Sequence, residues 1–433
     1  MARTWRNWTG DQRCAPAAIE EPGSEAELAD VLKRAAKAGH RVRPAGSGHS
    51  FTDIACSDGV MVSLKRMNRV GEASGNSLEV EAGITLHDLG PALAERGLAM
   101  ENLGDVDAQT LGGALATGTH GTGARFGNLS SQVERLRVVK AGGETAECSA
   151  AEDPDLFRAA RVGLGAIGVI TSVTLRCVPA HVLHRADEPK PRDETLDNLG
   201  ELADSHEHFE LFAFPYTNVA LTRKTDRSDA EPAPPAKPRA FLEDVLIENG
   251  VLGAFSRLGR RAPGLVPRIN RLLSGFIAPG ERVDHSHLVF ANPRLVRFTE
   301  MEYAIPRAAL GEAVRRVFQM IERRRLPVGF PVEVRVVAPD DAFLSPATGR
   351  DTGYLAVHMY RGTEFETYFR AVEAIMRDYD GRPHWGKRHY RTAAELEPLY
   401  PDWDRFQAVR ARVDPHGLFG NDYTDRVLGP VSP

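Results

Sequence analysis

Residues 43–50 read Arg-Pro-Ala-Gly-Ser-Gly-His-Ser and directly follow a short basic and apolar strand that we predict at 41–43. Gly46 and Gly48 can adopt backbone conformations that are closed to other residues. Successive N–H groups of such a turn can point inward and bind the oxygens of a phosphate. His49 would then stand beside the phosphate ligand. Taken alone, the stretch also fits an ordinary glycine-rich turn with a solvated histidine, because short glycine motifs have many false positives.

A second glycine cluster fills residues 102–123, NLGDVDAQTLGGALATGTHGTG. Nearly all side chains between Thr110 and Thr119 are small. Small side chains let the backbone approach a flat or phosphate-bearing ligand closely, and they equally let two backbones pack against each other. Both interpretations stay open at this stage.

The third cluster, VGLGAIGVI at 162–170, contains the spacing G-x-G-x-x-G of dinucleotide-binding folds. That motif should follow a strand and open a helix. Here a predicted helix at 155–161 precedes it and a predicted strand at 169–177 follows it. No βαβ unit with an acidic residue about 20 positions further on accompanies it. A loop near a ligand is therefore favoured over a nicotinamide site.

Composition excludes several classes of protein. The 433 residues allow about two or three domains. A net charge of −5 gives no basic excess for nucleic acid, so a small molecule is the expected partner. No window reaches about 18 unbroken apolar residues, which predicts no membrane span, and residues 1–10 contain no apolar core of signal-peptide length. The isolated cysteines form no C-x-x-C pair, so we predict no metal site and a cytoplasmic location; they are Cys14, Cys56, Cys148 and Cys177.

The first part of the chain has short strands and amphipathic helices rather than a regular βαβ alternation. Ser24 and Glu27 form a capping box that begins a helix over 24–37, and Gly39 suits its end. Further strands are predicted at 60–64 and 78–82, and a helix at 85–96.

After Pro179 the sequence becomes polar. We predict a flexible surface loop at 226–239 and a basic helical stretch at 241–285. The remainder predicts an antiparallel sheet covered on one face by helices; its strands are expected at 295–303, 331–338 and 354–360, and its helices at 307–325 and 364–379.

Two of these strands carry polar residues on one face. Alternation places Glu333 and Arg335 together, and likewise Tyr354, His358 and Tyr360. They could line a cleft for a polyhydroxylated substrate, although solvent-facing ion pairs are equally compatible with the pattern.

A dense cationic turn, Arg382-Pro383-His384-Trp385-Gly386-Lys387, follows. A cation such as Lys387 would stabilise the negative charge that develops on a flavin during hydride transfer. A plain basic turn is the alternative.

Together these segments resemble one family. RPAGSGHSFTDIA (43–55), ATGTHGTG (116–123), GLGAIGVI (163–170), EVR (333–335) and RPHWGK (382–387) recur in this order in the FAD-dependent aldonolactone oxidoreductases of the vanillyl-alcohol-oxidase superfamily. The resemblance covers nearly the whole chain. It is greatest to the bacterial L-gulono-1,4-lactone dehydrogenases and oxidases, through NLGDVD (102–107), FTEMEYAIPR (298–307) and GRPHWGKRHY (381–390).

The resemblance implies an α+β fold with two domains. Residues 1–180 would form an FAD-binding domain of the PCMH type, made of two α+β subdomains. Residues 181–375 would form a substrate or cap domain with an antiparallel sheet. Residues 376–433 would return to the flavin.

The resemblance also implies site residues. His49 would carry a covalent bond to the flavin in those members that have one. Glu333, Arg335, His358 and Lys387 would surround the substrate. The expected contacts with FAD are Pro44, Ala45, Gly46, Ser47, Gly48, His49, Ser50, Gly104, Asp105, Thr110, Gly113, Thr117, His120, Gly121, Ile167, Gly168, Ile170 and Lys387.

The implied reaction is the oxidation of L-gulono-1,4-lactone or a similar aldonolactone to an ascorbate-type product, with hydride transferred to flavin N5. We expect His358 to act as the general base, because an imidazole titrates near the working pH. Arg335 and Lys387 would stabilise negative charge, and Glu333 would orient substrate hydroxyls. The electron acceptor would be oxygen, for which Gly104 leaves room, or a carrier of the cytochrome or quinone type.

Three alternatives remain at this stage. An alditol oxidase that produces hydrogen peroxide is one, but Asp105 and Tyr360 replace a serine and a threonine of alditol oxidases near the expected substrate site and favour a lactone. A flavin-binding protein of other function is the second. A nicotinamide dehydrogenase that uses residues 163–168 is the third.

Overall fold

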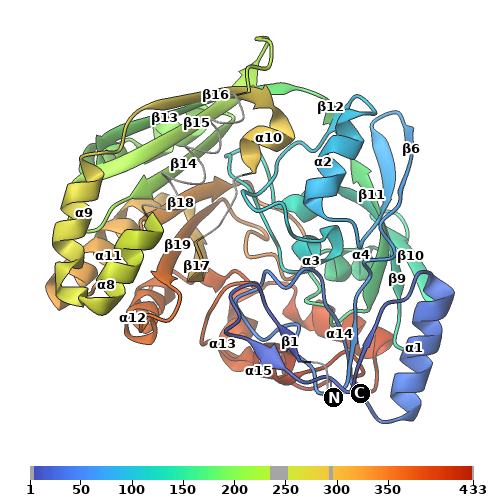
Figure 1. Ribbon diagram of the computed structural model, residues 1–433. Helices are drawn as coiled ribbons and strands as arrows, with labels where there is room; N and C mark the ends of the chain where they lie inside the picture. The colour runs from blue at the N-terminus through green and yellow to red at the C-terminus, as the bar shows by residue number, and fades with distance from the viewer. Residues whose placement is uncertain (1–3, 235–251, 292–295, 432–433) are drawn as a thin grey trace.

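The structure is a computed structural model that describes residues 4–234, 252–291 and 296–431. An N-terminal half built of small sheets lies beside a half dominated by one large sheet (Figure 1). Helices and strands both contribute and the large sheet is antiparallel, so the predicted α+β class is confirmed. No helix of the described residues is long and apolar enough to cross a membrane.

The N-terminal half contains two main sheets. A three-stranded parallel sheet has the order β3 (Ala18–Glu20), β5 (Val60–Val62), β4 (Val42–Pro44). A five-stranded antiparallel sheet has the order β10 (Thr145–Ser149), β9 (Val133–Val139), β11 (Val169–Arg176), β7 (Ser77–Glu81), β6 (Val70–Ser74). The helices of this half are α1 (Glu25–Lys37), α2 (Leu86–Ala94), α3 (Leu111–Ala116) and α4 (Pro154–Arg161), and its short strand pairs are β1 (Trp5–Arg6) with β2 (Arg13–Cys14) and β8 (Leu98–Ala99) with β12 (Val178–Pro179).

The start of α1 shows why this helix forms. Ser24 Oγ accepts a hydrogen bond from the backbone N–H of Glu27 at 3.2 Å, as predicted. The Glu27 carboxylate, however, accepts from the N–H of Gly23 instead of Ser24, so the capping box is shifted by one residue. Gly39 follows the helix with φ +71°, a left-handed conformation that glycine adopts without strain.

The C-terminal half is built on an eight-stranded antiparallel sheet. Its order is β16 (Gly280–His285), β13 (Val182–Pro191), β15 (Val219–Ser228), β14 (His208–Ala213), β18 (Val332–Val337), β19 (Thr352–Tyr360), β17 (Phe298–Pro306), β20 (Arg382–Pro383). One face is covered by helices, namely α5 (Arg192–Asp197), α6 (Leu199–Ser205), α11 (Leu310–Arg324) and α12 (Glu366–Arg377).

Alternation along β17 divides its residues between the two faces. Met301, Tyr303 and Ile305 belong to the hydrophobic core beneath the helices. Glu300 and Glu302 therefore point to the opposite face, toward the N-terminal half. The same alternation on β18 and β19 gives the sheet one apolar and one polar face.

The end of the chain returns to the N-terminal half, as expected. Val42 N–H donates to Leu418 O at 2.7 Å, and Leu418 and Phe419 pack in the core around α1. This segment contains α13 (Ala393–Leu396), α14 (Trp403–Val413) and α15 (Asp422–Leu428).

Several predicted boundaries were wrong. Residues 226–228 belong to β15 and not to a loop, and 235–239 lie outside the described residues. The strand predicted at 295–303 begins at Phe298 and continues to Pro306, while residue 295 is not described. The described part of the predicted helical stretch 241–285 contains α8 (Leu252–Arg261) and α9 (Val266–Ser274) but ends in strand β16, after which α10 (Ser286–Phe290) begins.

Candidate functional site

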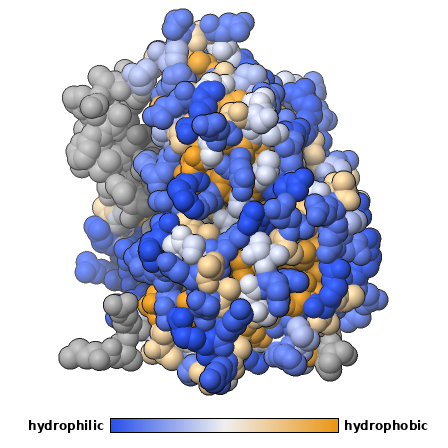
Figure 2. Space-filling model, turned by 90° about the vertical axis from the view of Figure 1, so that its right-hand side faces the viewer, coloured by the Kyte–Doolittle hydropathy of each residue, from blue (hydrophilic) through white to orange (hydrophobic). Residues whose placement is uncertain are grey.

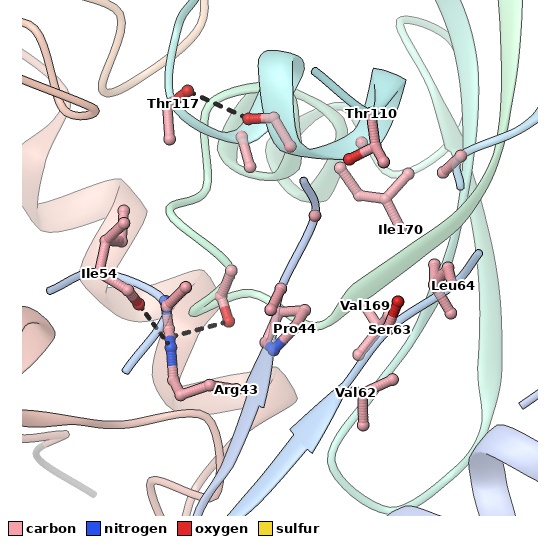
Figure 3. A pocket seen from close by; sticks show the side chains of 18 of the residues that line it. Arg43, Pro44, Ile54, Val62, Ser63, Leu64, Thr110, Thr117, Val169 and Ile170 are labelled. Carbon is pink, nitrogen blue, oxygen red and sulfur yellow. Dashed lines mark hydrogen bonds between the residues drawn. The ribbon is translucent and has the colours of Figure 1, made fainter. Parts of the chain in front are cut away.

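A cavity of about 1080 Å³ lies where the three glycine clusters meet (Figure 3). Loop 43–50, helix α3 and loop 163–170 supply most of its wall, and β5 adds Val62. Apolar residues such as Ile170 line it, and no aspartate or glutamate is among the lining residues.

The loops approach one another so closely that larger residues would not fit. A Cβ on Gly46 would lie 2.3 Å from Thr110 Oγ1. Gly165 has φ +67°, and a Cβ there would lie 2.8 Å from Pro44 Cγ. The small residues therefore let the loops pack closely, and the same residues line the cavity.

The fully buried Arg43 holds these loops in place. Its guanidinium donates to four carbonyl oxygens, those of Ile54 at 3.0 Å, Leu164 at 2.7 Å, Gly165 at 3.3 Å and Phe419 at 2.6 Å. Burial, with the nearby charge of Arg410, lowers the pKa of Arg43 to about 10, so the side chain stays charged at neutral pH. One cation thus connects loop 43–50 and loop 163–170 to the C-terminal segment.

Loop 43–50 also offers free hydrogen-bond donors. No described residue accepts a hydrogen bond from the backbone N–H groups of residues 46–50. Consecutive unpaired N–H groups form an anion-binding concavity. With no carboxylate in the wall, this loop fits the pyrophosphate of a dinucleotide such as FAD.

A second cavity, of about 820 Å³, adjoins the first. The two share His49, Ser50, Gln109 and Thr117. The His49 ring stacks on Trp8 with 5.6 Å between centroids, and burial followed by the charge of Lys387 lowers its pKa. The polar face of the large sheet forms the wall opposite this junction.

Charged side chains meet in this second cavity. Lys387 Nζ lies 2.5 Å from Glu300 Oε2, and Glu300 Oε1 lies 3.5 Å from His358 Nε2. Arg335 Nη2 lies 2.5 Å from Glu333 Oε1, and Arg335 Nε lies 3.1 Å from Glu210 Oε2. Each cation is thus fixed by a buried carboxylate, which restricts its position.

The surroundings of His358 determine its protonation. Its Nδ1 lies 3.4 Å from Pro331 O. Its Nε2 lies 3.5 Å from Glu300 Oε1 and 3.8 Å from Glu333 Oε2, so each ring nitrogen faces a group that can only accept. Burial disfavours the charged ring, but Glu300 and then Glu333 outweigh it and raise the pKa of His358.

Most salt-bridged acids have a lowered pKa, whereas the pKa of Glu333 is raised. Burial raises the pKa of its carboxyl, and the carboxylates of Asp105 and Glu210 add to this rise despite the contact with Arg335. For Lys387, burial is outweighed by the carboxylates of Glu300 and Glu302, which raise its pKa and keep it charged.

A buried trio stands beside these groups. His120 Nε2 lies 3.2 Å from Glu302 Oε1, and potential ligand atoms of His120, Glu302 and His384 all lie within 4.8 Å of one another. His384 Nδ1, however, accepts the N–H of Gly386 at 3.0 Å. Burial lowers the pKa of His384 to about 3, so this ring is neutral. Each ring thus already has a hydrogen-bond partner within the protein.

The structure divides the predicted FAD contacts among cavities. Gly104, Asp105, His120 and Lys387 line the second cavity. Gly121 lines neither of the two; it borders a smaller cavity with Arg223. The following residues line the first cavity: Pro44, Ala45, Gly46, Ser47, Gly48, His49, Ser50, Thr110, Gly113, Thr117, Ile167, Gly168 and Ile170.

The predicted substrate residues Glu333, Arg335, His358 and Lys387 all line the second cavity. Tyr360 does not; it lies at the end of β19 and lines a third cavity together with residues of α8 and α9. Our expectation that Tyr360 lies near the substrate was therefore wrong.

Sequence reasoning missed other residues of the second cavity, namely Glu300, Glu302, His384, Trp8 and Phe298. For the two glutamates a signal was available. In the stretch Phe298-Thr-Glu-Met-Glu, acidic residues alternate with apolar ones, which marks a strand with one polar face.

Comparisons with known proteins agree with this geometry. Residues 173–427 match the family described as D-arabinono-1,4-lactone oxidase, and residues 16–149 match an FAD binding domain, which confirms the predicted cofactor. An L-gulono-1,4-lactone dehydrogenase of Mycobacterium tuberculosis is 55% identical, over 99% of this chain and 100% of that protein. An L-gulonolactone oxidase of Bos taurus is 37% identical over 98% of both chains.

The fold also recurs in a solved structure. Cholesterol oxidase from B. sterolicum superposes with a TM-score of 0.83 over 99% of this chain and 97% of its own, at 17% identity. This likeness confirms the expected vanillyl-alcohol-oxidase type of fold.

Proposed function

This chain belongs to the D-arabinono-1,4-lactone oxidase family, and we propose that it oxidises an aldonolactone such as L-gulono-1,4-lactone to an ascorbate-type product with bound FAD. The observation that carries the proposal is the junction of the two cavities. A cavity suited to a dinucleotide opens at His49 onto a cavity lined by hydrogen-bonding and charged side chains. A sugar lactone presents the hydroxyls that such side chains bind.

When bound, FAD supplies the acceptor for the hydride that leaves the carbinol carbon. His358 Nε2 takes the proton of the reacting hydroxyl. Glu300 and Glu333 lie beside Nε2 and stabilise the imidazolium that forms. The raised pKa of His358 makes this nitrogen a stronger base, but it also requires a pH high enough to keep the ring neutral.

Arg335 and Lys387 stabilise the negative charge that develops on the substrate oxygen. Both are held against carboxylates within the cavity, so little reorganisation is needed when substrate binds. Glu333 bonds Arg335 with Oε1, which leaves Oε2 to accept from a substrate hydroxyl.

The covalent attachment of the flavin belongs to the proposal. The His49 ring lies at the junction, where a covalent bond to the flavin would form. In the wild-type chain, acid precipitation should carry the yellow colour into the pellet. In His49→Ala it should stay in solution, and colour in solution for both proteins would exclude the bond.

The electron acceptor is oxygen or a carrier of the cytochrome or quinone type. Gly104 lines the second cavity, and a Cβ there would lie 3.1 Å from His120 O, so a larger residue would press on the backbone of His120. The yield of hydrogen peroxide per lactone oxidised distinguishes oxygen from the carriers.

We retain the division into domains at 1–180, 181–375 and 376–433 and the cytoplasmic location as parts of the proposal. The cysteines support this location, since all four are free thiols, which suits a reducing compartment.

Anaerobic mixing tests the proposed function. L-gulono-1,4-lactone and related aldonolactones should bleach the flavin absorption of the holoenzyme, whereas alditols should do so much more slowly. Faster bleaching by an alditol would favour alditol oxidation, the second candidate. No bleaching by either class, with full bleaching by dithionite, would refute both.

A further inference from the structure

The outer face of the α8–α9 hairpin is unlike the rest of the surface. In the described part of the chain, five large hydrophobic residues are exposed, and four of them lie within residues 258–276. Leu272 is 56% exposed and Phe276 is 75% exposed. Figure 2, which shows the side that lies to the right in Figure 1, is by contrast mostly hydrophilic. Exposed apolar residues concentrated in one place indicate an interaction surface.

The same hairpin concentrates positive charge. Residues 252–280 contain five arginines and no aspartate or glutamate, in a chain whose net charge is −5. Arg257 and Arg271 directly adjoin exposed leucines in sequence, and the other three lie two or three positions from one; they are Arg260, Arg261 and Arg268. Helices that combine exposed leucine and phenylalanine with arginine-rich polar surface are typical of those that lie on membranes.

These arginines have no carboxylate partner among the residues that the structure describes. None of the five forms an ion pair with a described residue; Arg260 lies over the ring of Tyr360, and Arg271 donates to Pro267 O. Surface arginines elsewhere are commonly paired, for example Arg137 with Glu25 and Arg412 with Asp153. The hairpin therefore presents free cations to whatever binds it.

The α8–α9 hairpin packs against the rest of the protein on its inner side. Val266 and Asn270 are buried on its inner side. Asn270 Nδ2 donates to Pro215 O at 3.1 Å and to Val328 O at 2.9 Å. A partner would therefore meet the exposed side chains in a fixed arrangement.

From these observations we propose that the α8–α9 face binds the surface of an anionic lipid bilayer. Leu258, Leu265, Leu272 and Phe276 would enter the interfacial region, and the arginines would bind lipid phosphates. A second copy of the chain is disfavoured as the occupant, because two such faces would oppose five arginines to five arginines with no carboxylate.

Co-sedimentation of the holoenzyme with vesicles tests the proposal. Vesicles of phosphatidylcholine mixed with phosphatidylglycerol should carry the protein down, and vesicles of phosphatidylcholine alone should not. Added salt should weaken the binding, because it screens exposed charges. Equal binding to both vesicle types, or binding to neither, would overturn the proposal.

Variants locate the surface. Arg268→Gln with Arg271→Gln should weaken binding about 25-fold, since each arginine near an anionic bilayer contributes about fivefold. The matched control is Lys33→Gln with Lys37→Gln on α1, at the opposite end of the molecule, which removes the same charge and should leave binding unchanged (Figure 1).

Leu272→Ser with Phe276→Ser should weaken binding without any change in charge. These side chains are exposed, so the variants should keep the flavin spectrum and melting temperature of the wild-type protein. If both double variants bind the vesicles as tightly as the wild-type protein does, the lipid contact lies elsewhere and the proposal is overturned. So would a dimer in solution that the arginine variant dissociates.

Discussion

The cavity that we assign to FAD and the cavity that we assign to the lactone share His49 but are lined by different kinds of atoms. The first presents backbone N–H groups, glycines and apolar side chains, and its one charged residue, Arg43, is turned to carbonyl oxygens. The second presents carboxylates, imidazoles, a lysine and an arginine. The first cavity thus suits binding through its shape and its backbone donors, and the adjoining second cavity suits chemistry by charged side chains.

This difference in lining assigns cofactor binding to the first cavity and reaction with the substrate to the second. Residues of the first cavity should affect how tightly FAD is bound and how stable the protein is. Residues of the second should affect how fast and at which pH the lactone is oxidised. The following changes test that separation.

The largest effect is expected from His358→Ala. The rate of flavin reduction by lactone should fall by about 10²-fold or more, because the general base is lost, while FAD content should stay unchanged. Stopped-flow absorbance measures the rate, and His40→Ala, which removes an exposed imidazole, serves as the control. A wild-type rate would remove His358 from its role.

Arg43→Met should destabilise the protein by about 3 kcal/mol or more, because four buried carbonyl groups would lose their donor. The walls of the first cavity should separate, so flavin should also be lost on purification. Urea denaturation followed by tryptophan fluorescence measures the loss. An unchanged midpoint would show that Arg43 does not hold the loops together.

Gly46→Ala should weaken FAD binding about tenfold, because the new Cβ would overlap Thr110 Oγ1. The affinity is best titrated in the His49→Ala background, where no covalent bond holds the flavin. Adding Thr110→Ala removes the overlapping oxygen and should restore binding. If the second change brings no recovery, the close approach of the loops is not the cause.

The smallest effect is expected from Glu300→Gln, and it concerns pH. The Glu300 carboxylate raises the pKa of His358, so neutral His358 accumulates only at higher pH. Without that charge the pKa of His358 should fall, and the rising limb of flavin reduction should move to lower pH by about one unit. Glu300→Asp should keep much of the wild-type profile. An unmoved limb in the glutamine variant would disprove the coupling.

The two regions also differed in how far the sequence could predict them. The glycine-rich loops 43–50 and 163–170 could be recognised in the sequence, but only the family resemblance joined them into one FAD site. The charged residues of the second cavity could be predicted only in part from the sequence. Strand alternation paired Glu333 with Arg335, but nothing local to the sequence shows that Lys387 reaches Glu300, 87 positions away.

Strand ends were the least predictable feature of the fold. Tyr360 shares the alternation of His358, yet it lies past the end of the cavity, because the length of a cleft depends on what packs across it. The cation Arg43 was not singled out by sequence reasoning either, since its carbonyl partners come from three distant segments.

The visible absorption spectrum of the freshly purified, folded protein tests the central claim most directly. If the glycine-lined cavity holds FAD, each chain should carry one flavin, or should gain the yellow colour when FAD is added to flavin-free protein. Folded protein that is colourless and takes up no added FAD would contradict the account.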